Sequence, residues 1–201
     1  MMGLEKDILY LVSRVRYITE NQVGKVFNNK RRNNKKSLKR TLRKMCNDYT
    51  LRKFPCNINY TNFKDKSYVY YLNGGNLTNG NNLTKVLLGS EIAIRLNNAG
   101  YEVVRFYRKA KLGDKTYDIF IEYIDPSRQR QQILIDVKLN ENINYTKYDN
   151  IIYDVHNSTI PFFMVPKIVV ISSKEQNHNK YNINENIYFL DISLNKLFNY
   201  L

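Results

Sequence analysis

A mostly apolar run that carries two opposite charges places the strongest constraint on how this chain can fold. Residues 133–138 read Ile-Leu-Ile-Asp-Val-Lys, which is typical of a buried strand apart from Asp136 and Lys138. Side chains alternate between the two faces of a strand, so these two charged groups project from the same face. An unpaired charge on a buried strand is strongly unfavourable. The run therefore predicts a strand whose two charges meet a partner or a ligand on one face.

Two further carboxylates precede this strand in the sequence. Asp118 stands at the head of a second apolar run, residues 117–121, and Glu91 lies in the helix-like stretch 84–98. Carboxylates that converge from neighbouring strands can hold a divalent cation through their oxygens. A lysine beside them can orient or deprotonate the attacking water.

The sequence thus predicts a metal-dependent catalytic site. The catalytic residues would be Glu91, Asp118, Asp136 and Lys138. The expected cofactor is Mg²⁺ or Mn²⁺, held by Asp118, Asp136 and the Val137 carbonyl, with Glu91 as a direct or water-bridged ligand. Lys138 would position the water nucleophile.

Each of these residues also has a purely structural interpretation. Asp118 fits a turn residue at the edge of a strand. Asp136 and Lys138 fit a cross-strand ion pair, which contributes about 1 kcal/mol or less when exposed. Glu91 stands four residues before Arg95, a spacing that pairs opposite charges along a helix.

Positive charge is concentrated in the first third of the chain. The 201 residues carry a net charge of +14, and residues 1–72 alone hold 17 Lys and Arg against 5 Asp and Glu. The remaining residues hold 15 against 13. This asymmetry predicts that the first third binds a polyanion.

The same basic segment has helical patterning. Residues 5–17 predict one helix, and Thr19 is placed to cap a second, shorter one. A third helix is expected at 37–46, where one face is apolar (Leu38, Leu42 and Met45) and the opposite face is basic (Lys39, Arg40, Arg43 and Lys44). Residues 51–54 and 68–72 alternate like two strands joined by a polar loop.

Three helices followed by a hairpin is the order of a winged helix-turn-helix, in which the third helix enters the major groove of DNA. The loop of the hairpin would touch the DNA backbone or the minor groove. The residues expected to bind DNA are Lys35, Lys36, Ser37, Lys39, Arg40, Arg43, Lys44, Lys64 and Lys66. The alternative is a plain three-helix unit that binds protein.

A stretch rich in glycine and asparagine, residues 73–83, predicts a linker between two domains. The first domain would be the winged helix at 1–72, and the second would cover 84–201. The second domain opens with the helix 84–98, and a further helix is expected at 145–156. Strands are expected at 101–107, 117–124, 131–139, 167–172 and 187–190. This order predicts an α/β unit with a mixed sheet, so that the whole chain is α+β.

The second domain resembles the PD-(D/E)xK nuclease superfamily over roughly residues 83–172. Asp118 matches the first metal-binding Asp of that family, Asp136-Val-Lys138 matches its (D/E)xK, and Glu91 matches an acidic residue on its first helix. Residues 88–101 also look like a stretch of the Holliday-junction resolvase-like members. Tyr117 departs from the pattern, because the family often has Pro there. The resemblance implies a Mg²⁺-dependent endonuclease that hydrolyses DNA phosphodiester bonds.

A looser resemblance covers the whole chain. The basic third helix, the Tyr-Val-Tyr-Tyr-Leu strand and the pair Lys147-Tyr148 are similar to replication–relaxation type proteins of plasmids and conjugative elements. Those proteins often have Glu-x-Asp where this chain has Asp136-Val-Lys138. This kinship implies a nuclease-like fold that binds or dimerises without cutting, whereas Lys138 argues for cutting.

Other features narrow the function classes. No run approaches the length of a membrane span and no signal-peptide core is present, so no membrane partner is expected. Cys46 and Cys56 form no metal or disulfide pattern, which favours a reducing, intracellular compartment. His156 and His178 have no ligand spacing, and no phosphate-binding loop is present, so no nucleotide cofactor is expected.

The leading interpretation is a DNA-binding, metal-dependent endonuclease of a mobile element, phage or plasmid. The rival is a non-catalytic DNA-binding factor for replication, mobilisation or transcription on the same fold. A protein-interaction module with incidental basic charge is a third alternative. An enzyme that makes one cut would need two copies to cut both strands, which suggests a homodimer.

Overall fold

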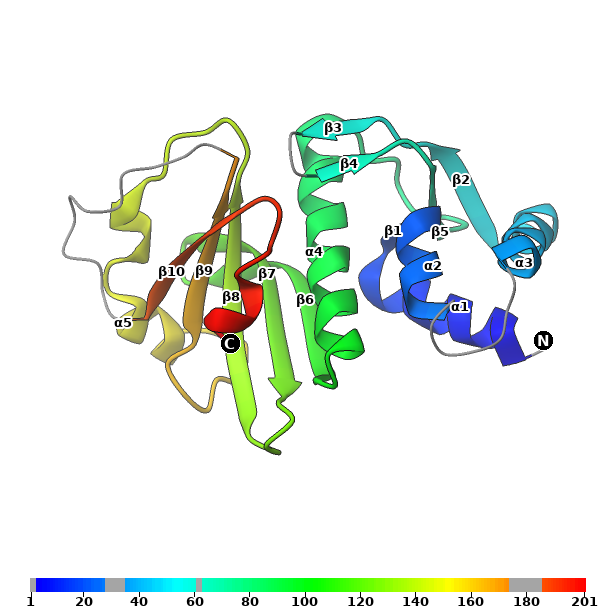
Figure 1. The fold of residues 1–201 in the computed structure, drawn as a ribbon. Helices are drawn as coiled ribbons and strands as arrows, with labels where there is room; N and C mark the ends of the chain where they lie inside the picture. The colour runs from blue at the N-terminus through cyan, green and yellow to red at the C-terminus, as the bar shows by residue number, and fades with distance from the viewer. Residues whose placement is uncertain (1–2, 28–34, 61–62, 174–185) are drawn as a thin grey trace. The chain divides into compact units, whose positions relative to one another are not determined.

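A computed structural model of the chain describes residues 3–27, 35–60, 63–173 and 186–201 (Figure 1). The chain divides into two compact units, residues 1–99 and residues 100–201. Both units combine helices with strands, and the second holds a mixed sheet, which confirms the predicted α/β class. No helix among the described residues is both long and apolar enough to cross a bilayer.

The first unit places four helices around a small antiparallel sheet. The sheet has the order β1-β5-β2, and β3 and β4 form a separate hairpin. The helices are α1 (Gly3–Val15), α2 (Glu20–Phe27), α3 (Lys35–Asn47) and α4 (Gly80–Asn98). The strands are β1 (Tyr17–Thr19), β2 (Leu51–Pro55), β3 (Ile58–Tyr60), β4 (Phe63–Asp65) and β5 (Tyr68–Leu72). The predicted helices and the predicted β2–β5 pair are confirmed, and the β3–β4 hairpin lies within the expected polar loop.

Local sequence signals explain α2 and α3. The Thr19 hydroxyl accepts a hydrogen bond from the Gln22 backbone N–H at 3.2 Å, and the Gln22 side chain accepts one from the Thr19 N–H at 3.1 Å. This reciprocal pair is a capping box, and it confirms the cap predicted at Thr19. In α3 the apolar residues at helical spacing are buried as predicted: Leu38, Leu42 and Met45.

Helix α4 differs from the expected organisation in its start and in its contacts. It begins at Gly80, inside the expected linker 73–83. Leu83 and Leu87 pack in a core cluster with Cys56, Ile58 and Val69 of the first unit. Because its side chains contribute to that core, α4 belongs by its contacts to the first unit, and the division falls after it, between Ala99 and Gly100.

The second unit is built on a five-stranded sheet of order β10-β9-β8-β7-β6. β6, β7 and β8 form an antiparallel meander, whereas β8, β9 and β10 run parallel. The strands are β6 (Glu102–Leu112), β7 (Lys115–Ile124), β8 (Arg130–Lys138), β9 (Lys167–Ser172) and β10 (Ile187–Asp191). Two 3₁₀ helices, η1 (Tyr145–Tyr148) and η3 (Leu197–Asn199), and one α-helix, α5 (Ile151–His156), complete the described part.

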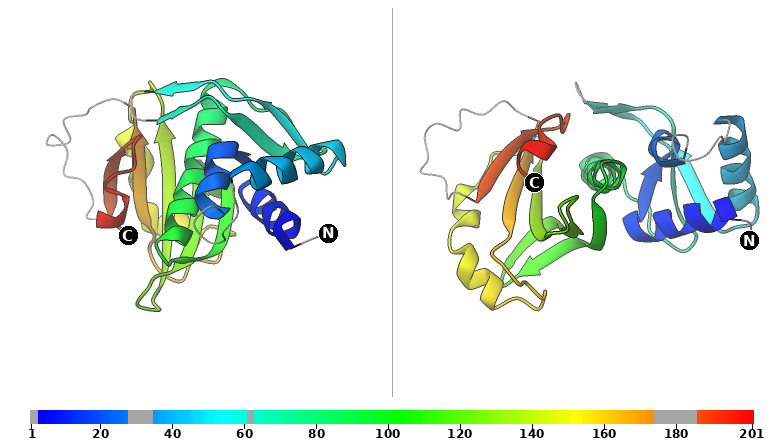
Figure 2. Two further views of the ribbon diagram at one scale, coloured as in Figure 1. Left: turned by 45° about the vertical axis from the view of Figure 1, so that its right-hand side comes forward. Right: turned by 60° about the horizontal axis from the view of Figure 1, so that its bottom comes forward.

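The helix expected at 145–156 is divided into η1 and α5. Asn150 separates them with a left-handed backbone, φ 59°, which ends one helical segment before the next begins. Figure 2 shows α5 lying against one face of the five-stranded sheet. Ile151 of α5 and Tyr148 of η1 pack there with Phe120 and Leu134 of the sheet. This packing covers the face of β8 from which Leu134, Asp136 and Lys138 project.

The capping box gives a first prediction. Thr19→Ala removes one half of the box from a fully buried residue, so the free energy of unfolding should fall by about 1 kcal/mol. Urea denaturation followed by circular dichroism measures this loss. Thr41→Ala is the matched control, because the Thr41 hydroxyl only bonds the Ser37 carbonyl within exposed α3. An equal loss in both variants would contradict the role of the cap.

Candidate functional site

Asp118 and Asp136 meet where β7 and β8 separate. The β7–β8 ladder begins at the pair Ile119–Ile135, and the same register continued by one residue sets Asp118 opposite Asp136. Instead of a further ladder bond, the Asp118 carboxylate accepts a hydrogen bond from the Val137 backbone N–H at 2.7 Å. A side chain therefore replaces the main chain as the partner of β8 at this point.

The same contact orients the Val137 carbonyl. In a strand the N–H and the C=O of one residue point to the same side. Since the Val137 N–H points toward Asp118, its carbonyl is also directed toward β7, where the two strands separate. The three predicted metal ligands of the second unit therefore lie on neighbouring positions of β7 and β8, just beyond the last ladder pair: Asp118, Asp136 and the carbonyl of Val137.

The neighbouring strand is also irregular beside Asp118. The β6–β7 register passes from the pair Arg108–Ile119 to the pair Ala110–Tyr117, so Lys109 stands opposite Asp118 without a ladder pair. Lys109 has a left-handed backbone with φ 53°, which is unusual for a residue other than glycine. Backbone strain of this kind gathers at functional sites.

Two hydrogen-bond donors and a second ammonium group surround one oxygen of Asp136, which is only 2% exposed. Its Oδ2 atom lies 2.8 Å from Lys147 Nζ, 2.8 Å from the Tyr148 hydroxyl and 3.4 Å from Lys138 Nζ. Lys138 Nζ also lies 3.8 Å from Glu141 Oε2, and Lys147 Nζ donates to the Thr116 carbonyl at 2.6 Å. Asp136 is therefore a buried carboxylate that is fully compensated by positive and polar groups.

These contacts determine the protonation of the site. Burial opposes ionisation of Asp136, but the hydrogen bond and charge of Lys147, together with Lys138 and Tyr148, outweigh it and hold the pKa of Asp136 below its ordinary value. Burial and the adjacent Asp136 charge raise the pKa of the Tyr148 hydroxyl, which stays a hydrogen-bond donor. At neutral pH Asp136 is an anion.

Lys147 and Tyr148 belong to this site although the sequence did not assign them to it. The sequence singled them out only as a pair, after the third strand, in which the chain resembles replication–relaxation type proteins. No spacing rule connects them to Asp136, because η1 brings them there through tertiary packing. Their contacts with Asp136 make them positioning residues for the carboxylate.

The donor set suits a hard cation that keeps part of its water shell. Among the described residues, no group of three or more His, Cys, Asp and Glu side chains forms a metal cage. Mg²⁺ commonly uses one or two carboxylates together with waters and substrate phosphates, so a complete protein cage is not required. Asp118, Asp136 and the Val137 carbonyl provide such a set, and the donors around Asp136 contact Oδ2 and not Oδ1.

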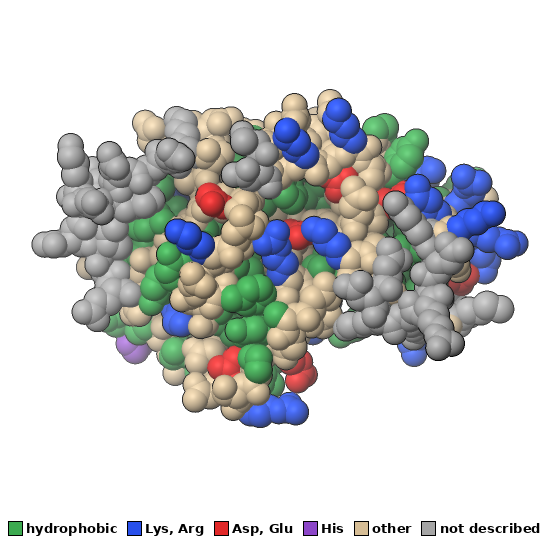
Figure 3. Space-filling model, viewed as in Figure 1, with side chains coloured by type: hydrophobic (Ala, Val, Ile, Leu, Met, Phe, Trp, Pro, Cys, Tyr) green, Lys and Arg blue, Asp and Glu red, His purple; other side chains and the backbone are tan. Residues whose placement is uncertain are grey.

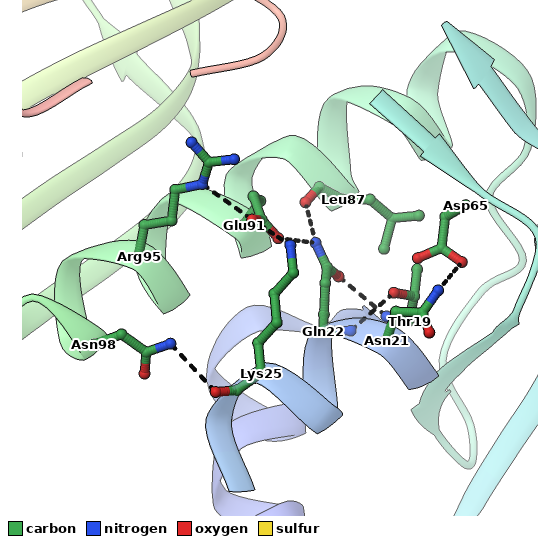
Figure 4. A network of polar contacts seen from close by, with 9 residues as sticks. All are labelled: Thr19, Asn21, Gln22, Lys25, Asp65, Leu87, Glu91, Arg95 and Asn98. Atoms are coloured by element: carbon green, nitrogen blue, oxygen red, sulfur yellow. Dashed lines mark hydrogen bonds and ion pairs between the residues drawn. The ribbon is translucent and has the colours of Figure 1, made fainter. Parts of the chain in front are cut away.

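Glu91 is held within the first unit (Figure 4). Its Oε1 atom accepts from Lys25 Nζ at 2.6 Å and from Arg95 Nε at 3.0 Å, and Oε2 accepts from the Gln22 side chain at 3.2 Å. Both carboxylate oxygens are thus engaged by donors of α2 and α4, and the Arg95 pair considered from the sequence is present. Glu91 joins α2 to α4, while its role as a metal ligand stays a prediction.

The predicted DNA-binding residues divide into tethered and untethered cations. Lys39 Nζ lies 2.9 Å from Glu20 Oε1, and Lys44 Nζ lies 2.7 Å from Glu5 Oε1. Arg40 and Arg43 are exposed on the same helix, and neither has an acidic partner in the described part of the chain. Basic side chains gather over α3 in Figure 3.

The remaining predicted DNA contacts lie at the start of α3 and on the hairpin. Lys36 and Ser37 are exposed in the first turn of α3. Lys64 is exposed on β4, and Lys66 is exposed in the turn that follows. Lys35 begins α3, but its side chain lies outside the described residues.

The Glu91 contacts predict a pH dependence. Burial disfavours the charged form of Glu91, but Lys25 and Arg95 outweigh it and lower its pKa. A lowered pKa contributes stability that is present above the unfolded value of about 4.3 and is lost as the pH falls through the folded value. Glu91→Gln should therefore lower the free energy of unfolding by about 1–3 kcal/mol at pH 6 and by less below pH ~4.

Urea denaturation of parent and Glu91→Gln between pH ~3 and ~7 measures this difference. Glu102→Gln is the control, because Glu102 is an exposed acid on β6. A deficit of Glu91→Gln that stayed constant down to pH ~3 would contradict the linkage.

Similarity searches do not assign the site. Comparison of the chain with family models, with curated proteins and with solved structures finds no match. The functional interpretation therefore depends on the geometry of the residues described above.

Proposed function

We propose that the protein binds DNA through its first unit and hydrolyses DNA phosphodiester bonds at the Asp118–Asp136 site of its second unit. The observation that carries this proposal is the placement of Asp118 opposite Asp136 just beyond the last β7–β8 ladder pair, with Lys138 Nζ 3.4 Å from Asp136 Oδ2. The second unit would be a PD-(D/E)xK-type nuclease domain. The first unit would be a winged helix-turn-helix that reads duplex DNA for a mobile element, phage or plasmid.

The residues of the site divide the chemical work. Asp118, Asp136 and the Val137 carbonyl would hold Mg²⁺ or Mn²⁺, which supplies charge neutralisation at the scissile phosphate and a more acidic water. The Lys138 ammonium, 3.4 Å from Asp136 Oδ2, has donors left to orient the attacking oxygen. Asp118 additionally fixes the β8 backbone through the Val137 N–H, which keeps the carboxylates in register.

The DNA-binding surface would centre on α3 and the β3–β4 hairpin. In a winged helix the third helix enters the major groove and the wing contacts the backbone. The exposed guanidinium groups of Arg40 and Arg43 suit base edges or phosphates, and Lys64 and Lys66 lie on the hairpin side. Lys39 and Lys44 are already paired with acids, so they would contribute less.

A second candidate function is a non-catalytic DNA-binding factor. It is favoured by the compensation of Asp136, whose Oδ2 atom is contacted by Lys147, Lys138 and Tyr148. In that case the carboxylate would be a structural ion pair, and DNA binding through α3 would be the whole function. Either function is compatible with a homodimer, which double-strand cutting would need.

Because two of the basic side chains of α3 are paired with acids, we expect substitutions along this helix to weaken DNA binding to different extents. Arg40→Ala and Arg43→Ala should each weaken binding to duplex DNA about tenfold at ~100 mM salt and reduce the salt slope by about one. Lys39→Ala and Lys44→Ala should change the affinity by less than about threefold, because their charges are offset by Glu20 and Glu5. Fluorescence anisotropy across a salt series measures both quantities.

Lys196→Ala is the charge-matched control, since Lys196 is an exposed cation of the second unit. If Lys39→Ala and Lys44→Ala lose more DNA affinity than the arginine variants, the prediction that Arg40 and Arg43 make the main DNA contacts is wrong.

The catalytic proposal predicts metal-dependent cutting. Supercoiled plasmid should be nicked or linearised with Mg²⁺ or Mn²⁺ and stay intact with EDTA. Asp118→Asn and Lys138→Ala should lower the rate at least about 100-fold while DNA affinity stays within about threefold, because both residues act on the reacting groups. Asp114→Asn, an exposed acid in the β6–β7 turn, is the matched control.

The two candidate functions separate in the same assay. Intact plasmid with clear retardation in a gel, and no effect of Mg²⁺ on the melting temperature, would favour the non-catalytic factor. Cutting that persists in both variants would show that the site lies elsewhere.

A further inference from the structure

The ammonium group of Lys147 is held by the kinds of ligand that hold a metal cation. Its Nζ atom contacts Asp136 Oδ2 at 2.8 Å and the Thr116 carbonyl oxygen at 2.6 Å. It also lies 4.7 Å from the centre of the Tyr117 ring, a cation–π distance. The side chain is only 16% exposed. A carboxylate and a carbonyl oxygen are also the ligands that Mg²⁺ and Mn²⁺ prefer.

The backbone around Lys147 is fixed, so this contact is built into the fold. Asn144 caps η1 by accepting hydrogen bonds from the Thr146 backbone N–H at 3.2 Å and from the Thr146 hydroxyl at 2.7 Å. The next residue, Tyr148, is 1% exposed in the core and also donates to Asp136. The cap at Asn144 and the buried Tyr148 therefore hold η1 in the position that places Lys147 against Asp136.

Two ammonium groups already offset most of the negative charge at the site. Lys138 and Lys147 supply two positive charges beside Asp136, against the negative charges of Asp118, Asp136 and the half-exposed Glu141, which lies 3.8 Å from Lys138. A divalent ion that used Asp136 Oδ2 would have to replace the Lys147 ammonium or share the oxygen with it. Two cations a few ångströms apart repel each other strongly even in a polar environment.

We propose that Lys147 is an intrinsic counter-ion that competes with the divalent cation and sets the metal affinity of the Asp118–Asp136 site. This inference rests on the proposed function, because it concerns the same site. Lys147 neutralises Asp136 when no metal is present, and it weakens metal binding by charge and by occupation of Oδ2. In this proposal the Lys147 ammonium group takes the place of the divalent cation beside Asp136.

Lys147→Met tests the competition, because methionine keeps an unbranched apolar chain over Tyr117 and removes the charge. Mn²⁺ binding, measured without DNA by electron paramagnetic resonance and by calorimetry at ~100 mM salt, should tighten at least about tenfold. Without metal, in EDTA, the same variant should melt at a lower temperature, because Asp136 loses its nearest cation. If Lys147→Met does not fold, Lys147→Gln keeps a hydrogen-bond donor and serves the same purpose.

Two control variants separate charge from packing. Tyr148→Phe removes a donor to Asp136 Oδ2 without changing the charge, so the Mn²⁺ affinity should change less than about threefold. Lys167→Met removes a lysine with similar contacts but no carboxylate: its Nζ atom donates to the Tyr200 carbonyl at 3.2 Å and lies 6.0 Å from the Tyr188 ring. Its Mn²⁺ affinity should equal that of the parent.

The outcomes distinguish this inference from the proposed function. If the parent binds Mn²⁺ in a manner that Asp136→Asn abolishes, and Lys147→Met binds it no tighter, the inference fails while the metal site stands. If only Lys147→Met binds Mn²⁺ through Asp136, the inference holds and the parent is a blocked site. If no variant binds Mn²⁺ through Asp136, the metal-dependent function and the inference both fail.

Discussion

The buried carboxylate of Asp136 is the group on which the geometry of the second unit's site depends. At 2% exposure it must be compensated, and its partners are drawn from two segments: Lys138 two residues later on β8, and Lys147 and Tyr148 on η1. Satisfying this one charge fixes η1 against the sheet. The same requirement brings two ammonium groups to the point where β7 and β8 separate. The groups that neutralise Asp136 are therefore also the groups that lie at the candidate catalytic site.

Glu91, the one residue of the predicted catalytic set that lies in the first unit, has its charge compensated by other partners. Its carboxylate is nearly buried and is neutralised by Lys25 and Arg95, with a further hydrogen bond from Gln22. These partners belong to the first unit, so Glu91 stabilises the attachment of α4 to α2. A pattern of acids in sequence order therefore contains residues with different physical roles, because the partners of each acid differ.

Strong local patterns made much of this fold predictable. The buried apolar run of β8, the apolar stripe of α3 and the Thr19 cap each come from side chains within one element, and each is present as predicted. The start of α4 was not predictable, because its first turn is polar and is held partly by the Tyr60 hydroxyl on Asn81. The contact of Lys147 with Asp136 could not be predicted for a similar reason. It depends on the burial of Tyr148 in the core and not on the spacing of apolar residues in the sequence.

The two candidate functions differ in one physical quantity, the availability of negative charge at the β7–β8 separation. A binding factor needs Asp136 only as a buried anion, and the two lysines satisfy it. An enzyme needs the same anion to prefer a divalent ion over an ammonium group. Asp118 tilts the balance toward the enzyme, because one of its oxygens takes the place of a ladder partner and turns the Val137 carbonyl toward the same point.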